Sequence, residues 1–245
     1  MPATLSVKPD YGVDAPAVMR NLFLIGALCL LIAVFGPHII TLGQVSILPK
    51  PMFGWTAGFL LVEGFLFLFY VKVGKFYHRD KMLSLHTWRG DELVLDVGCG
   101  RGLLLAGAAK LIPDGHATGI DVWSNVDMGG NSAEATHHNL KLEGVESRTT
   151  LLSESAAEMT FPDATFDVIV SNLCLHNIYD RPTRLRALHE IVRVLKPGGT
   201  ALISDYKHTG EYAAEFVDCG LAVTKKRGDP ITTFPPLTIV IARKS

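Results

Sequence analysis

The sequence has few cysteines and no close pair among them. It contains no Cys-x-x-Cys spacing, and its four cysteines are far apart: Cys29, Cys99, Cys174 and Cys219. This spacing excludes a disulfide scaffold and a zinc ribbon, and it fits reduced thiols facing a cytosol. The neighbouring His137 and His138 fall in a predicted helix, where adjacent side chains point about 100° apart and cannot easily share a metal ion. We therefore predict no metal site.

The chain also has almost no net charge. Its formal charge is −1, its isoelectric point is about 6.7, and charged residues make up 19% of the sequence. No basic field argues for a nucleic-acid partner. The mean hydropathy of +0.27 is high for a soluble enzyme, and the excess lies near the N-terminus. A length of 245 residues allows one domain of ordinary size plus a small addition.

Two long apolar runs lie in the first third of the chain. Residues 21–35 carry no charge, and the run resumes after Pro37, so we expect one membrane span with a kink at that proline. Residues 53–71 contain a single acid, Glu63. Their eleven Leu, Val and Phe residues favour insertion by about 3–7 kcal/mol, whereas one central charge costs about 3 kcal/mol. A cleaved signal peptide would explain only the first run.

The basic residues near these runs predict their orientation. Lys8 and Arg20 precede the first run, and the turn between the runs carries only Lys50. Four basic residues follow the second run: Lys72, Lys75, Arg79 and Lys81. The positive-inside rule then places both termini in the cytoplasm. We predict a two-pass integral membrane protein, with an anchor at 1–74 and a cytoplasmic domain at 75–245.

A glycine-rich turn follows a short apolar strand in that domain. The strand at 93–97 contains Asp96 near its end, and a Leu- and Ala-rich helix at 103–111 comes after the turn. Three glycines at alternate positions form the turn: Gly98, Gly100 and Gly102. A dinucleotide-binding turn needs a glycine where this chain has Leu103. The carboxylate would also repel a pyrophosphate, but it suits a cationic amino group.

The pattern acid-x-Gly-x-Gly-x-Gly resembles the first motif of class I S-adenosylmethionine (SAM) dependent methyltransferases. A second strand, 117–120, ends on Asp121, about two dozen residues after the first acid, where a carboxylate can bind both ribose hydroxyls. The resemblance implies that SAM is the cofactor. It also implies that Asp96, the three glycines, Asp121 and Val122 bind it.

Further along, 166–170 is a predicted strand that leads into Ser-Asn-Leu-Cys-Leu-His-Asn, which is again similar to the family. The resemblance places Asn172 and Leu173 beside the cofactor and His176 on the substrate side. The stretch is not Asn-Pro-Pro-Tyr, which lowers the odds of a nucleic-acid methyltransferase. Counting back from Phe161-Pro162-Asp163, the family's adenine-binding acid falls on Ser155, with Ala156 next; Glu154 and Glu158 are alternatives.

The resemblance implies an α/β fold: a Rossmann-like methyltransferase domain with a mostly parallel seven-stranded sheet, here preceded by two transmembrane helices. An amphipathic linker helix is expected at 75–88, with Phe76 and Met82 on its apolar side. A second helix is opened by Asn131 in a capping box and ends at 143. The remaining expected elements are a strand at 148–152, a helix at 183–195, a strand at 200–204, a helix at 210–219 and a closing antiparallel pair at 221–227 and 237–242.

Substrate contacts are expected at the same edge of the sheet. Trp123, a candidate substrate contact, belongs to a long loop, 122–130. This loop is either a lid or substrate-contact loop, with Trp123 against the adenine, or merely a longer loop. Tyr206, Lys207 and His208 follow the fifth strand of the predicted sheet. His176 is the candidate general base, and the alternative that it only packs or binds substrate stays open.

These observations predict a membrane-anchored SAM-dependent methyltransferase that acts on a hydrophobic small molecule such as a quinone, lipid or thiol. The partners expected are that acceptor and the bilayer. A protein methyltransferase at the membrane, a scaffold that binds SAM without catalysis, and a nucleotide-binding oxidoreductase are the alternatives; Leu103 and Asp96 disfavour the last. We expect removal of 1–72 to leave SAM binding intact.

Overall fold

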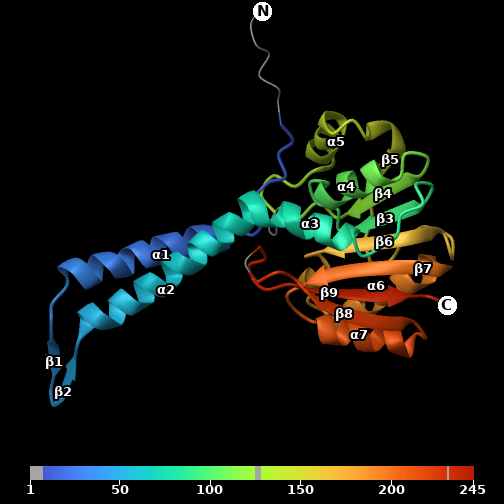
Figure 1. The fold of residues 1–245 in the computed structure, drawn as a ribbon. Helices are drawn as coiled ribbons and strands as arrows, with labels where there is room; N and C mark the ends of the chain where they lie inside the picture. Colours follow the sequence, from blue (N-terminus) through green and yellow to red (C-terminus); the bar gives the residue numbers. More distant parts are fainter. Residues whose placement is uncertain (1–7, 125–127, 231) are drawn as a thin grey trace, which may run out of the picture.

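A computed structural model describes residues 8–124, 128–230 and 232–245. It has a long helical hairpin joined to an α/β body (Figure 1). The hairpin consists of α1 (Pro16–Phe35), a short antiparallel pair formed by β1 (Ile40–Leu42) and β2 (Val45–Ile47), and α2 (Pro49–Phe69). The two helices approach closely because small residues lie between them: Gly26 faces Leu61, and Gly64 faces Phe23.

The expected kink at Pro37 is wrong, because α1 ends before it. Gly36 has an extended backbone, and its N–H donates to the carbonyl of Ile32 at 2.8 Å. Pro37 has no N–H with which to continue the helix, and the apolar residues after it form the hairpin strand β1. The 20 residues of α1 extend over about 30 Å, which is enough to span a bilayer alone.

The second helix of the hairpin continues beyond the apolar run at 53–71. A π-helical turn, η1 (Tyr70–Gly74), joins α2 to α3 (Lys75–Leu83), so the expected linker helix stops short of residue 88. Gly74 lies so close to the carbonyl of Thr232 that a Cβ would overlap it. The buried side of α3 also differs from the expected one: Met82 is buried as predicted, but Lys75 and His78 lie beside it, and Phe76 is only half-buried.

The body contains a seven-stranded sheet in the order β5-β4-β3-β6-β7-β9-β8. The first five strands in this order are parallel, and β9 runs antiparallel to both β7 and β8. The predicted mostly parallel sheet is therefore confirmed. Its strands are β3 (Leu93–Val97), β4 (His116–Asp121), β5 (Thr149–Ser153), β6 (Phe166–Asn172), β7 (Leu195–Asp205), β8 (Ala222–Arg227) and β9 (Thr238–Arg243).

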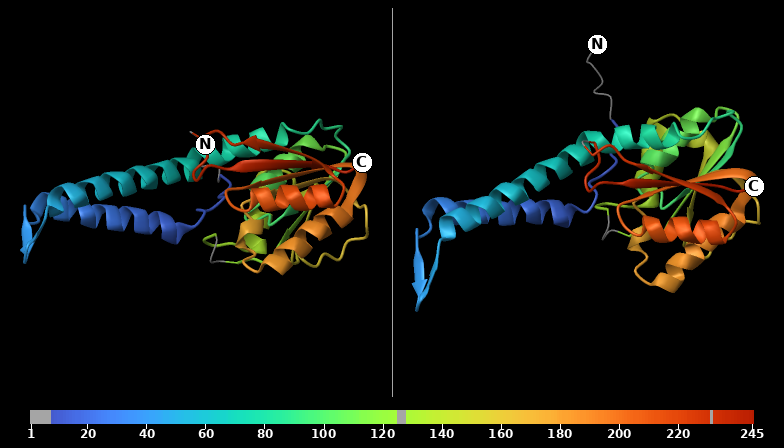
Figure 2. Two further views of the ribbon diagram at one scale, coloured as in Figure 1. Left: turned by 90° about the horizontal axis from the view of Figure 1, so that it is seen from below. Right: turned by 60° about the horizontal axis from the view of Figure 1, so that its bottom comes forward.

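Helices cover both faces of the sheet, as the views in Figure 2 show. The helices of the body are α4 (Leu103–Leu111), α5 (Ala133–Leu142), α6 (Arg181–Val194) and α7 (Thr209–Asp218), with short 3-10 turns η2 (Glu146–Arg148) and η3 (Leu175–Asn177). On one face Leu188 of α6 and Phe216 of α7 pack with Ile169 of β6. On the other face Met82 and Leu105 pack with Val94. Central strands that are buried on both faces explain the continuous apolar runs in the sequence.

The start of α5 differs from the expected capping box. Ser132, rather than Asn131, is the N-cap, and its hydroxyl accepts a hydrogen bond from the N–H of Ala135 at 3.2 Å. Serine is among the preferred N-cap residues because its side-chain oxygen satisfies a free N–H of the first turn. Asn131 is buried instead, and its amide nitrogen donates to Asp121 Oδ1 at 3.2 Å. The residue expected to cap the helix thus supports the candidate site.

Candidate active site

The candidate site lies where the order of the sheet reverses. From β3 the chain adds β4 and β5 on one side and then returns to add β6 on the other. In open α/β sheets ligands bind outside the carboxyl ends of the strands at such a switch point. Asp96 near the end of β3 and Asn172 at the end of β6 both lie at this edge, and Asp96 is paired with Val170 in the ladder. The structure therefore brings together two residues that the sequence predicted for one site.

The turn after β3 follows a path that only glycine allows. Gly98, Gly100 and Gly102 all have positive φ, at 72°, 50° and 82°. A Cβ at Gly98 would overlap the side chain of Cys174. The N–H of Gly98 donates to the carbonyl of Ile120 in β4 at 2.8 Å, which fixes the turn across two strand ends. Because these residues carry no side chain of their own, the backbone of the turn can approach a bound molecule closely.

Asp96 is a buried carboxyl group at the base of the cleft. Only 1% of it is exposed, and its Oδ2 atom has no hydrogen-bond partner among the described residues. Burial, followed by the nearby Asp121 carboxylate, raises the pKa of Asp96 to about 8. An unpartnered buried oxygen is costly, and a donor with positive charge would both satisfy it and favour its ionised form. The position therefore suits an ammonium group.

Asp121, at the end of β4, is held in a fixed orientation. Its Oδ2 accepts from the N–H of Gly100 at 2.8 Å, and its Oδ1 accepts from the N–H of Trp123 at 2.6 Å as well as from Asn131. Each carboxylate oxygen has two lone-pair directions, so the group retains capacity for a further donor. Val122, which follows it, is 67% exposed. The carboxylate is thus oriented before any ligand binds.

The predicted adenine side is more open. The indole N–H of Trp123 donates to Ser153 Oγ at 2.7 Å, so this ring lies across the end of β5. Ser155 is exposed and forms an isolated bridge with Glu158, whereas Ala156 packs against the core. Residues 125–127 of the proposed lid lie outside the described residues. The structure places Trp123 and Ser155 on this side of the sheet, after β4 and β5 respectively.

The predicted acceptor side holds a histidine beside a buried acid. His176 Nδ1 lies 2.8 Å from Asp205 Oδ1, and the ring of Tyr206 meets the imidazole edge-to-face at 4.7 Å. Asp205 is fully buried and accepts from the N–H groups of His176 and Tyr206 at 3.1 and 2.9 Å and from the Tyr212 hydroxyl at 3.3 Å. Of the other two predicted contacts, Lys207 is exposed and His208 is the N-cap of α7.

Asp205 was not among the predicted site residues. It ends β7 just as Asp121 ends β4, and an acid at the carboxyl end of a buried strand was the signal available in the sequence. Burial, followed by the Asp205 carboxylate, raises the pKa of the Tyr206 hydroxyl. Tyr206 therefore stays a neutral phenol at neutral pH and can donate a hydrogen bond.

The structure adds a wall that motif reasoning missed. The cleft over the glycine turn is lined from three parts of the chain: Tyr11 and Asp14 before α1; Tyr70, Lys75, Arg79 and Met82 on the helix leaving the hairpin; and Asp96, Gly98, Gly100, Arg101, Met128 and Asn172 of the body. Asn172 also contacts Tyr70 and His78. No local pattern in the sequence indicates this wall, because a helix face with tyrosine, lysine and histidine ordinarily points to solvent.

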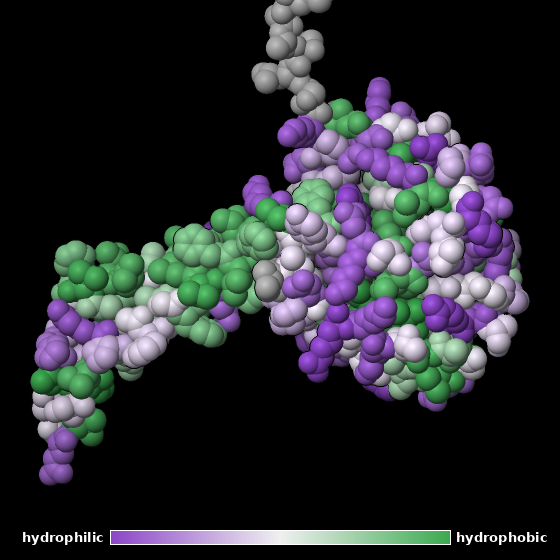
Figure 3. Space-filling view, viewed as in Figure 1, coloured by the Kyte–Doolittle hydropathy of each residue, from purple (hydrophilic) through white to green (hydrophobic). Residues whose placement is uncertain are grey.

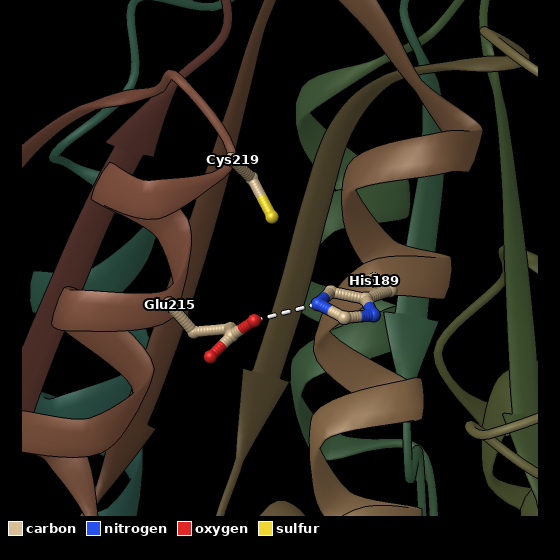
Figure 4. Close-up of side chains that lie close together, drawn as sticks. All are labelled: His189, Glu215 and Cys219. Atoms are coloured by element: carbon tan, nitrogen blue, oxygen red, sulfur yellow. Dashed lines mark hydrogen bonds and ion pairs between the residues drawn. The ribbon is translucent and has the colours of Figure 1, made fainter.

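A second cluster of polar side chains lies between α6 and α7, on the helices rather than at the strand ends (Figure 4). His189 Nε2 is 2.6 Å from Glu215 Oε1, and the thiol of Cys219 lies near both. His189 and Cys219 are exposed. Burial, followed by the neighbouring Glu215 and Asp218 carboxylates, raises the pKa of the Cys219 thiol, which disfavours the thiolate form that metals bind. We describe the cluster as a hydrogen-bonded pair at the surface with a neighbouring thiol.

The surface of the hairpin differs from that of the body, as Figure 3 shows. Both α1 and the continuous helix Pro49–Leu83 are long and apolar enough to cross a membrane. Large apolar side chains on them face outward, including Leu24, Leu28, Phe35, Trp55 and Phe59, each more than half exposed. Exposed apolar surface on this scale is typical of protein–protein and membrane interaction sites.

Comparison with known proteins identifies the family. A family model described as a methyltransferase domain matches residues 95–203. An uncharacterized methyltransferase of Mycobacterium bovis is 32% identical over 171 residues, which are 66% of this chain and 79% of that protein. The chain belongs to the class I SAM-dependent methyltransferase family.

Other relatives are matched over shorter stretches or in fold alone. A demethylmenaquinone methyltransferase of Symbiobacterium thermophilum is 35% identical over 50% of this chain and 45% of its own length, so this chain spans less than half of that relative. Geranyl diphosphate C-methyltransferase from Streptomyces coelicolor, solved with S-adenosylhomocysteine, shares the fold, with a TM-score of 0.55, 13% identity and coverage of 69% of this chain and 79% of its own.

Proposed function

We propose that this chain is a membrane-anchored methyltransferase that transfers a methyl group from SAM to a hydrophobic small molecule on the cytoplasmic side of a bilayer. The proposal rests on one cleft that is lined both by the glycine turn of the body and by a helix that leaves the hairpin. Its base is the glycine turn with Asp96, and its side is the helix that continues out of the apolar hairpin. A cofactor site of the family therefore lies directly beside the segment proposed to enter the membrane.

The residues at the strand ends fit SAM. Asp96 would hold the amino group of the cofactor, since its buried Oδ2 needs a donor. Asp121 would bind the ribose hydroxyls, with Val122 beside it. The positive-φ glycines would let the backbone of the turn approach the cofactor. Asn172 and Leu173 would flank the methionine end, while Ser155, Ala156 and Trp123 would lie toward the adenine.

Bound SAM supplies a methyl group already activated by the sulfonium. The chain must position the acceptor in line with that methyl group and remove a proton where the acceptor has one to lose. His176 would act as the base. The Asp205 carboxylate lies 2.8 Å from its Nδ1 atom and would stabilise the imidazolium that forms when Nε2 takes a proton. Tyr206 and His208 would contact the acceptor.

A hydrophobic acceptor explains why the enzyme has an anchor. The cleft residue Tyr70 packs in an apolar cluster with Phe67 of α2, and Leu173 and Phe234 of the body pack against this cluster, at the place where the hairpin meets the body. An acceptor dissolved in the bilayer could reach the cleft there without crossing water. The relative from Symbiobacterium thermophilum is named for a quinone substrate, which is a hydrophobic small molecule of this kind.

The expectation that 1–72 can be removed without loss of SAM binding conflicts with this arrangement, because that deletion takes Tyr11, Asp14 and Tyr70 out of the cleft. The test therefore uses the full chain. Membranes containing it are incubated with SAM carrying a tritiated methyl group and then extracted with organic solvent. We expect label in the lipid extract with the wild type and none with Asp121→Ala. Label confined to protein or to the aqueous phase would overturn the proposed acceptor class.

A further inference from the structure

Residues 10–14, here called the strap, cross the glycine turn just before the chain enters α1. One end of the strap is fixed to the body by Asp10. Its N–H donates to Asn139 Oδ1 at 2.9 Å, and Asn139 Nδ2 donates back to the carbonyl of Asp10 at 2.8 Å. The Asp10 carboxylate pairs with Arg101 of the glycine turn at 3.1 Å. A segment near the N-terminus is thereby bound to residues more than 90 positions away.

The middle of the strap is fixed by the helix that leaves the hairpin. Lys75 is only 6% exposed, and its Nζ donates to the carbonyls of Tyr11 and Gly12, both at 2.8 Å. The same Nζ lies 3.5 Å from Asp14 Oδ2. A buried ammonium group is costly unless its donors are used, and here its partners all belong to the strap. Lys75 therefore acts as a latch.

The strap covers the part of the cleft that fits an amino acid. Asp14 forms a bridge with Met128, whose side chain reaches the Gly100 backbone. Arg101, which lines the cleft, has a buried Nε with no partner among the described atoms of the chain. An amino-acid zwitterion needs acceptors for its ammonium and donors for its carboxylate. The lining of the cleft offers both: carboxylates from Asp14 of the strap and from Asp96, and guanidinium groups from Arg79 and Arg101.

We propose that the strap closes over the amino-acid end of the cofactor and that Lys75 holds it closed. This inference rests on the proposed function, since it takes the cleft to be the cofactor site. Cofactor must then leave by lifting the strap, which breaks the bonds from Lys75 to Tyr11 and Gly12. The strap leads directly into α1 and Lys75 follows η1, so both cytoplasmic ends of the hairpin hold the cofactor in place.

The test uses the full-length protein in lipid nanodiscs and S-adenosylhomocysteine as the probe. Lys75→Met keeps the length of the side chain but removes its donors; Lys72→Met is the matched control, because Lys72 is exposed one turn earlier on the same helix. We expect Lys75→Met to weaken binding and speed dissociation by a factor on the order of 10, and Lys72→Met to stay near wild type. Wild-type affinity and dissociation rate in Lys75→Met would overturn the latch.

A measurement on the unmodified chain keeps the inference testable if Lys75→Met folds poorly. Hydrogen exchange at the amides of the strap should slow on addition of S-adenosylhomocysteine, because a closed strap cannot open while the ligand is beneath it. Unchanged exchange in the strap, with ligand bound, would overturn the closure. A wild-type chain that does not bind S-adenosylhomocysteine at all would instead overturn the proposed function.

Discussion

The hairpin and the body bury their apolar residues in different ways. In the body, Leu95, Ile169 and Leu188 are fully buried by helices on both faces of the sheet. In the hairpin, α1 buries only Gly26 and Cys29, and four of its five leucines are exposed. A chain that can build one packed core does not leave a second apolar surface open to water without cause. The exposed apolar residues of the hairpin are those expected of the proposed membrane anchor, because a bilayer has the matching thickness and apolarity.

The largest effect is expected from a substitution in the body that abolishes ligand binding but leaves the hairpin unchanged. Gly98→Ala places a Cβ against Cys174 at a φ of 72°, and steric overlap together with the left-handed backbone costs up to about 5 kcal/mol. We expect calorimetry to show no binding of S-adenosylhomocysteine, while the protein stays in the membrane fraction. Gly210→Ala is the control, since that glycine has open space around it. Normal binding by Gly98→Ala would show that the turn does not hold the cofactor.

The next largest effect is expected from a substitution in the hairpin that weakens membrane insertion but leaves the body unchanged. Leu28→Arg places a charge in the middle of α1, which disfavours membrane insertion by about 3–4 kcal/mol. Leu142→Arg is the matched change in the body, at a leucine that is also exposed. Carbonate extraction of membranes should release much of the first variant and leave the second in place. Equal behaviour of the two would contradict a bilayer around α1.

A smaller effect concerns the charge of Asp96. Its pKa of about 8 means that it is protonated at neutral pH in the free protein, whereas an ammonium ligand requires the carboxylate. Affinity for S-adenosylhomocysteine should therefore rise between pH 6 and 8 by up to about tenfold per pH unit. The stability of the ligand-free fold should depend on pH in the opposite direction. The contribution of the raised Asp96 pKa to stability is fully present below about pH 4 and is lost as pH rises through 8. Asp96→Asn should remove both dependences in calorimetric titrations and thermal melts.

The smallest effect is expected at the cluster between α6 and α7. His189→Ala removes an exposed ion pair with Glu215, which should change the free energy of unfolding by about 0.2–1 kcal/mol. Chemical denaturation of wild type and variant, each with and without a chelator, measures this. A large loss of stability on chelation in the wild type alone would show that His189, Glu215 and Cys219 hold a metal ion.

Local patterns predicted the part of the fold that carries the family's motifs. The strand ending near Asp96, the glycine turn and the strand ending at Asp121 are contiguous signals, and the structure places all three at one edge. The end of α1 was predicted less well. A continuous apolar count cannot show that Gly36 ends the helix and that the residues after Pro37 pair as β1 and β2.

The wall of the cleft could not be predicted, because it depends on contacts between distant parts of the chain. Lys75 lies 64 positions from Tyr11, and Asn139 lies 129 positions from Asp10. Lys75 also looked like one of several basic residues flanking a membrane span, since its burial depends on the strap folding back over it. Periodicity along one helix carries no information about a partner segment that packs against it.

Labelling of cysteines introduced at chosen surface positions in intact cells tests most directly whether the hairpin crosses the bilayer with the body in the cytoplasm. Cys219→Ser removes the exposed thiol, and Lys50→Cys or Lys207→Cys then adds a probe at the tip of the hairpin or in the body. A membrane-impermeant maleimide should modify the probe at position 50 in intact cells and the probe at position 207 only after lysis. Labelling of position 207 in intact cells, or of neither probe before lysis and both after it, would contradict the account.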